Sequence, residues 1–223
     1  MLQDTARKSV SNPSPLVEWR GTDAPALRSH FAALARELHP QREGDSALAF
    51  SIGVTSCQGG EGVSTVAANL ALQAAKTSDR RVLMVDANLE NPGLSRQFRL
   101  AAQSGLVDCL AGRATLDECV LRLASEDSLS ILPAGGCTPS EQVNCDRLDA
   151  LLDDLHENFD LLILDLPPVS ELSLAVTVAR RLDGVLLVIS KERVTADTAL
   201  RAKRRLLQNQ VPLLGAVFNE YRV

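Results

Sequence analysis

The feature that most constrains the fold is a regular alternation between short apolar runs of strand length and longer segments with helical periodicity. Such alternation is typical of an α/β fold, in which a doubly wound, mostly parallel sheet carries helices on both faces. The expected strands are 49–55, 81–86, 128–132, 161–165, 184–190 and 213–218. The expected helices are 63–76, part of 106–123, 145–158, 171–181 and 196–209.

The N-terminal part of the chain differs from this pattern. Residues 1–23 are rich in polar residues and proline without periodicity, which predicts a flexible tail. Within 24–38, Leu27, Phe31 and Leu34 recur at helical spacing, which predicts an amphipathic helix. Residues 39–46 carry turn formers and are expected to be a linker. We therefore expect one domain over 24–223.

Composition excludes several classes of function. The net charge of -5 argues against a broad grip on nucleic acid, so we expect no nucleic-acid partner. No apolar run reaches the roughly 18 residues that span a bilayer, and the first residues lack the apolar core of a signal peptide. These features predict a cytoplasmic protein. Its 5 cysteines form no CxxC pair and its 3 histidines lack ligand spacing, which predicts free thiols and no metal site built from them.

A glycine-rich loop follows the first expected strand and leads directly into the next helix. The strand AFSIGVT is followed by residues 56–65, SCQGGEGVST, after which helical periodicity begins. A strand, a glycine-rich loop and a helix N-terminus direct several backbone N–H groups and the helix dipole at one point, which favours a phosphate. The residues expected to contact a nucleotide here are Gly59, Gly60, Glu61, Gly62, Val63, Ser64 and Thr65.

This loop departs from the strict P-loop pattern G-x-x-x-x-G-K-[ST] at two places. Cys57 stands at the first glycine position and Val63 at the lysine position, while Gly62 and Ser64 match. Ser64 can offer its hydroxyl to Mg²⁺, but Val63 has no charge to place between the β- and γ-phosphates. The alternative is a glycine-rich turn that binds nothing. The flanking strand and helix favour a degenerate phosphate site.

Polar residues end three of the expected strands, at the edge of the sheet where ligands bind in such folds. Asp86 ends one strand, and Asp165 ends another directly before a Pro-Pro pair. Because hard cations prefer oxygen ligands, two carboxylates beside a phosphate loop suit a Mg²⁺-nucleotide, with Ser64 as a further ligand. We expect Asp86 and Asp165 to be the catalytic and metal-binding carboxylates. Asn219 ends the last strand, where its amide can contact the edge of an adenine ring.

In this order and spacing, these elements resemble the bacterial tyrosine kinases (BY-kinases) of capsule and exopolysaccharide systems, a branch of the MinD/ParA-like P-loop ATPases. The resemblance covers about residues 23–219. It implies ATP and Mg²⁺ as ligands, a membrane-embedded polysaccharide co-polymerase or modulator as partner, and homo- or hetero-oligomers at the inner face of the membrane. The family loop T-S-x-x-P-G-E-G-K-S-T is matched by Thr55, Ser56, Gly60, Glu61, Gly62, Ser64 and Thr65, and the family D-x-P-P element by Asp165, Pro167 and Pro168.

The departures from the family pattern fall on the residues that the resemblance links to catalysis. Val63 replaces the lysine, and within the D-x-D-x-R element Asn88 replaces the second aspartate, while Glu90 stands at the arginine position. Gln58 stands where MinD and ParA relatives carry an additional lysine. The resemblance thus predicts a relative that binds ATP and Mg²⁺ weakly or not at all, with kinase activity reduced or lost.

Two further family elements, both linked to assembly and autophosphorylation, are also changed. The E-x-Y-R-type element of the N-terminal helix is replaced by Thr22, Ala24 and Pro25, and the tyrosine-rich tail is reduced to the single Tyr221. These changes favour a regulator that works with a membrane co-polymerase.

Two alternatives stay open. In the first, an active kinase or ATPase draws its missing cation from Lys191 or Arg193, just after the strand GVLLVIS. In the second, the chain is a MinD- or ParA-like positioning ATPase. The D-x-P-P element favours the polysaccharide branch over this second alternative.

Overall fold

The sheet of the computed structural model has eight strands in the order β1-β4-β5-β3-β6-β2-β7-β8, with β1 contributing two residues. The structure describes residues 16–17, 25–38, 49–77, 80–100, 103–136, 145–171 and 174–220. The strands are β1 (Leu16–Val17), β2 (Phe50–Ser56), β3 (Val82–Asp86), β4 (Leu121–Leu123), β5 (Glu126–Leu132), β6 (Leu161–Asp165), β7 (Gly184–Ser190) and β8 (Leu213–Asn219).

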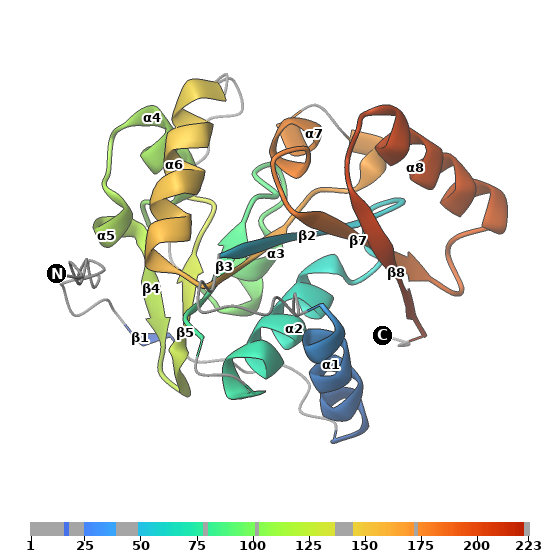
Figure 1. Ribbon diagram of the computed structural model, residues 1–223, viewed down its shortest axis with the longest axis horizontal. Helices are drawn as coiled ribbons and strands as arrows, with labels where there is room; N and C mark the ends of the chain where they lie inside the picture. The colour runs from blue at the N-terminus through green and yellow to red at the C-terminus, as the bar shows by residue number, and fades with distance from the viewer. Residues whose placement is uncertain are drawn as a thin grey trace, which may run out of the picture.

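Helices cover both faces of this sheet (Figure 1). The α-helices are α1 (Pro25–Glu37), α2 (Val63–Thr77), α3 (Gly93–Gln97), α4 (Leu106–Ala111), α5 (Leu116–Cys119), α6 (Cys145–Asn158), α7 (Leu174–Ala179) and α8 (Ala196–Gln208), and a 3-10 turn, η1, spans Val169–Glu171. The helices α1, α2 and α3 pack on one face of the sheet, and α4 to α8 pack on the other. No helix in the described ranges is long and apolar enough to cross a bilayer.

The burial of the middle strands on both faces explains the continuous apolar runs in their sequences. All neighbouring strands pair in parallel except β4 and β5, which are antiparallel. Strands β3 and β6 are buried along their whole length, because apolar side chains point into a helical layer on each face. Since β3, β6 and β2 are neighbours, their carboxyl ends meet at one place, and the loops that follow them are brought together.

The expected α/β fold is confirmed, and the six expected strands are present with ends within two residues of the observed ones. Part of the region 106–123 is helical, as expected, and its last residues form a strand that was not expected. Gly112, with φ of 70°, ends α4, and after α5 the chain enters β4, where Leu121 and Leu123 are buried and Arg122 is exposed. This alternation has the period of a strand, over a length too short to stand out in the sequence. The helix α3 was not expected from the sequence.

The N-terminal region is described in part. The amphipathic helix expected over 24–38 corresponds to α1, which packs on α2. Within the expected tail, Leu16 and Val17 pair in parallel with β4, so this part of residues 1–23 is strand. The rest of that tail and the expected linker 39–46 lie outside the described residues.

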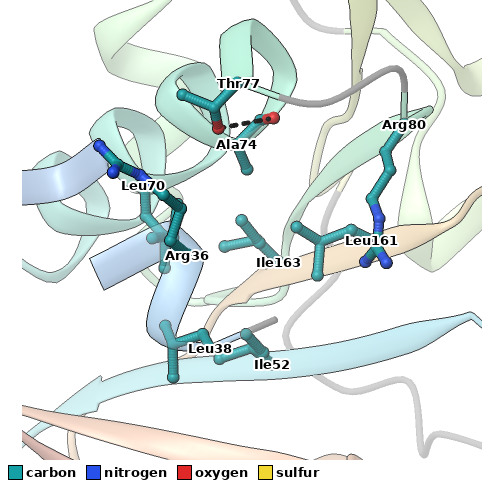
Figure 2. Close-up of a pocket in the computed structure, with 10 residues that line it drawn as sticks. Arg36, Leu38, Ile52, Leu70, Ala74, Thr77, Arg80, Leu161 and Ile163 are labelled. Atoms are coloured by element: carbon teal, nitrogen blue, oxygen red, sulfur yellow. Dashed lines mark hydrogen bonds between the residues drawn. The ribbon is translucent and has the colours of Figure 1, made fainter. Parts of the chain in front are cut away.

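A small apolar cavity of about 50 Å³ lies between α1, α2 and the sheet. Figure 2 shows Leu161 and Ile163 of β6 between Arg36 and Arg80, with Ile52 and Leu38 below them in this view. Leu161 begins β6 and Arg80 precedes β3, so the cavity lies toward the amino ends of these strands. It is therefore at the opposite end of the strands from the loops that carry the candidate site.

Candidate nucleotide site

The loop between β2 and α2 turns sharply at two glycines. Gly60 and Gly62 adopt φ values of 81° and 90°, a region that residues with a Cβ rarely occupy. A Cβ on Gly62 would meet the amide of Asn219, and one on Gly60 would meet the guanidinium of Arg193. The glycines are thus required both by the turn and by side chains from the ends of β7 and β8 that lie against it.

Glu61 braces this loop from within. Its side chain is almost fully buried, with 1% exposure. One carboxylate oxygen accepts a hydrogen bond from the backbone N–H of Gln58 at 2.6 Å, and the other accepts from the backbone N–H of Ser190 at 2.9 Å. Glu61 was expected from the sequence to contact a nucleotide. In the structure its carboxylate ties the loop to the end of β7.

Asn219 makes a second tie to the same loop. Its Nδ2 donates to the carbonyl oxygen of Glu61 at 2.9 Å. Asn219 lies at the carboxyl end of β8, so this bond attaches the loop to the edge strand of the sheet. Its expected contact with an adenine ring stays a prediction.

The two expected carboxylates lie side by side. Asp86 at the end of β3 is in register with Asp165 at the end of β6, and both side chains are 0% exposed. Asp86 Oδ2 accepts hydrogen bonds from the N–H and hydroxyl of Ser95, at 2.9 and 3.1 Å. Asp86 Oδ1 and both carboxylate oxygens of Asp165 are buried without a hydrogen-bond partner.

Burial makes ionisation of this pair unfavourable. Loss of solvent raises the pKa of Asp86 from 3.8 to about 6, against the lowering effect of the Ser95 hydrogen bonds. Loss of solvent, followed by the negative charge of Asp86, raises the pKa of Asp165 from 3.8 to about 8. Two buried acids with unsatisfied oxygens are an arrangement that a cation or a proton would stabilise.

The short helix α3 closes over these carboxylates, and sequence reasoning missed it. Besides the Ser95 contacts, Gln97 Nε2 donates to the hydroxyl of Thr65 at 2.9 Å. Gly93 lies so close to Ser64 that a Cβ on it would overlap the Ser64 hydroxyl. Five residues are too few to show helical periodicity, so only the positions of Gly93 and Ser95 after the second strand could have suggested this contact.

The family that this chain resembles consists of P-loop proteins, which agrees with the glycine-rich loop between a strand and a helix. The ParA family model, described as an NUBPL iron-transfer P-loop NTPase, matches residues 48–222. The tyrosine-protein kinase YwqD of Bacillus subtilis is 32% identical over 171 residues, which cover 76% of this chain and 71% of YwqD.

The chain belongs to the bacterial tyrosine kinase family.

Other members link the family to polysaccharide export. The succinoglycan biosynthesis transport protein ExoP of Rhizobium meliloti is 32% identical over 212 residues, which cover 89% of this chain but 26% of ExoP. Among solved structures, the VpsO kinase domain superposes with a TM-score of 0.76 at 25% identity, covering 88% of this chain and 95% of that domain. The chain thus corresponds to the kinase domain of relatives that can be much longer.

The oxygen donors of the site could provide part of the coordination of a Mg²⁺ ion. Among the described residues, no group of three or more His, Cys, Asp or Glu side chains could hold a metal ion. Asp86, Asp165 and Ser64 nevertheless offer oxygen atoms beside the phosphate loop, and Mg²⁺ is commonly held by one or two carboxylates together with substrate phosphates. The unsatisfied oxygens of the two aspartates are those that such an ion would contact.

The donors for the phosphates themselves fit less well. Val63 begins α2 at the lysine position and packs against the apolar cluster between α2 and the sheet. Lys191 pairs with Glu220 at 2.8 Å, at the exposed surface. Arg193 is closer to the loop, since its Nη1 donates to the carbonyl oxygen of Gly60 at 3.2 Å. A positive charge therefore lies at the outer side of the loop, in place of one at the start of α2.

Proposed function

We propose that this chain is a catalytically impaired BY-kinase homologue of exopolysaccharide or capsule biosynthesis and export, which acts as a regulator or partner of a membrane co-polymerase. The observation that carries the proposal is Val63, a partly buried apolar residue that packs against the core at the position of the P-loop lysine. The identity to tyrosine kinases favours this function over that of a MinD- or ParA-like positioning ATPase.

The loss of the lysine affects binding and chemistry to different degrees. A hydrogen bond to a charged group contributes about 1.5–3 kcal/mol, so its absence weakens nucleotide affinity by roughly 10- to 150-fold. The backbone N–H groups of the loop still favour a phosphate, and Gly60 and Gly62 still hold the required conformation. Transfer suffers more than binding, because charge that develops on the phosphoryl group meets no lysine.

The remaining site residues have distinct parts in this proposal. Mg²⁺, when bound with a nucleotide, neutralises charge on the phosphate oxygens. Asp86, Asp165 and the Ser64 hydroxyl would hold it, while Ser95 orients Asp86 through its two hydrogen bonds. Glu61 and Asn219 keep the loop attached to β7 and β8. In this proposal, these contacts keep the loop and the carboxylates in place without the residue on which efficient transfer depends.

The partner in this proposal is inferred from the names and lengths of the relatives. ExoP is named for biosynthesis and transport of a polysaccharide, and this chain corresponds to 26% of it. We propose that the chain works beside a membrane protein that carries the transport function, and that its contribution to polymer assembly depends on its surfaces.

Calorimetric titration of the full chain with Mg²⁺-ATP tests the proposal, together with an assay of tyrosine phosphorylation in the purified protein. We expect weak or undetectable binding and no significant phosphorylation. A dissociation constant below about 1 μM, which corresponds to about 8 kcal/mol of binding free energy, would contradict an impaired site.

A second candidate function rests on Arg193. In this alternative the chain is an active ATP-dependent kinase or ATPase, and Arg193 supplies the cation from the end of β7. The hydrogen bond from its guanidinium to Gly60 favours Arg193 over Lys191, whose ammonium pairs with Glu220. Tight ATP binding that disappears on substitution of Arg193 would establish this alternative.

A further inference from the structure

An apolar and basic surface lies at the open edge of the sheet, on α8 and β8. Strand β8 forms one edge of the sheet. Large apolar side chains in this region are exposed to solvent, among them Leu200 by 50%, Leu207 by 53% and Phe218 by 70%. Leu200 and Leu207 belong to α8, which lies beside β8 (Figure 1). We call Leu200, Lys203, Arg204, Leu207 and Phe218 the edge surface.

The helix α8 presents this surface on the flank toward the open edge. On its other flank Arg205 reaches the carbonyl oxygen of Ser170 in η1, toward the middle of the sheet. At 3.6 residues per turn, Leu200 and Leu207 lie about 140–160° around the helix from Arg205. The two leucines therefore point away from the sheet centre.

Phe218 lies on the same side of the sheet as α8. It is in register with Ile189 of β7, and Ile189 belongs to the apolar cluster beneath α6, α7 and α8. Its neighbour Val217 packs against the cluster on the opposite face, as expected from alternation along a strand. Phe218 thus adds an exposed apolar side chain on the side of the sheet that α8 covers.

The charge of this region is opposite to that of the whole chain. The helix α8, ADTALRAKRRLLQ, carries four basic residues and one acidic residue, whereas the chain has a net charge of -5. The acidic residue, Asp197, is neutralised by Arg201 at 2.7 Å. Lys203 and Arg204 are exposed. They lie between the two leucines in the sequence and on either side of them around the helix.

From these observations we propose that the edge surface docks directly on an anionic lipid surface. A helix that combines leucines with lysine and arginine lies in the interface of a bilayer, where the apolar side chains enter the acyl boundary and the cations meet lipid phosphates. A stable protein partner requires roughly 800 Å² per side with complementary shape, whereas a bilayer accepts a few apolar side chains on a convex helix. This inference does not depend on nucleotide binding.

Sedimentation of the full chain with vesicles tests the proposal. The vesicles contain phosphatidylcholine alone or phosphatidylcholine with about 30% phosphatidylglycerol. We expect binding to the anionic vesicles that weakens with added salt. Each basic side chain near such a surface contributes about 5-fold to partitioning, so Lys203→Gln with Arg204→Gln should reduce binding by about 25-fold. Leu200→Gln with Leu207→Gln should also reduce it.

A matched control pair, Lys76→Gln with Arg122→Gln, removes the same charges from α2 and β4, far from β8 in the sheet order. We expect this pair to bind vesicles like the original chain. Equal loss from both charge pairs, or no binding to anionic vesicles at low salt, would overturn the proposal. Binding to polyglutamate without binding to vesicles would likewise overturn it, in favour of an acidic protein partner.

Discussion

Asp86 and Asp165 are in register at the ends of β3 and β6, with both side chains fully buried and three of their four carboxylate oxygens without a hydrogen-bond partner. The fold therefore holds two acids together at a free-energy cost. Buried groups that reduce stability are common where a protein retains a binding site.

Without Mg²⁺, the free energy of unfolding should fall as the pH rises from about 4 to about 8. The folded-state pKa values of Asp86 and Asp165, about 6 and about 8, are raised above 3.8, so over this range the folded protein binds more protons than the unfolded chain. Asp165→Asn removes the less favourable charge and should stabilise the protein at pH 7.5 by about 1–3 kcal/mol, with a flatter pH profile. Urea unfolding at several pH values measures this, with the exposed Asp153→Asn as control. Stability that rises with pH would contradict it.

Val63→Lys should restore part of the phosphate site. A lysine here places a charge at the start of α2, and ATP affinity should increase by roughly 10- to 150-fold. Val63→Met extends the side chain without charge and should leave the affinity unchanged, which separates charge from packing. Titration calorimetry measures both variants. Autophosphorylation should stay low, because the chain has a single tyrosine.

Substitution of Arg193 separates the two candidate functions. If its guanidinium assists phosphate binding, Arg193→Ala should weaken the measured ATP affinity by about 10-fold or more, whereas Lys191→Ala should not change it. The two residues are two positions apart on the same turn, and Lys191 pairs with Glu220. An equal affinity for both variants and the original chain would exclude Arg193 as a relocated cation.

Gly93→Ala should displace α3 from the carboxylates. The added Cβ would overlap the Ser64 hydroxyl, so the helix or the loop must move, at a cost of about 1–3 kcal/mol. For a domain of this size that corresponds to a decrease in Tm of about 2–12 °C. Gly136→Ala is the control, because a Cβ there meets no atom within 4 Å. Equal Tm values for the two variants would show that α3 adapts without cost.

If the chain acts in polymer assembly through its surfaces, deletion of its gene should affect polymer output more than substitution of its two buried aspartates. Deletion of the gene should reduce polymer output or alter its length. A strain with Asp86→Asn and Asp165→Asn should produce polymer near the original level at equal protein abundance, since isosteric changes at an unused site have small effects. If the double variant matches the deletion while the protein stays folded and abundant, the metal site is used and the impaired-kinase proposal fails.

The sequence by itself determined the fold class, the main strands and the approximate place of the site. Continuous apolar runs follow from strands buried on both faces, and a glycine-rich loop between a strand and a helix follows from local backbone geometry. Both signals are local, so β2, β6 and β7 and the loop 56–65 could be recognised without knowledge of their neighbours. The absence of the P-loop lysine could likewise be recognised from the sequence, because Val63 stands at the lysine position of the P-loop pattern.

Only the tertiary structure decided which residues meet. Glu61 reaches Ser190 across 129 positions, and Asn219 reaches Glu61 across 158, contacts that no local pattern specifies. The helix α3 forms in five residues because its serine and glycine fit against Asp86 and Ser64, so tertiary packing, and not periodicity, creates it. The exposure of Phe218 likewise depends on the position of β8 at the edge of the sheet, which the order of strands determines.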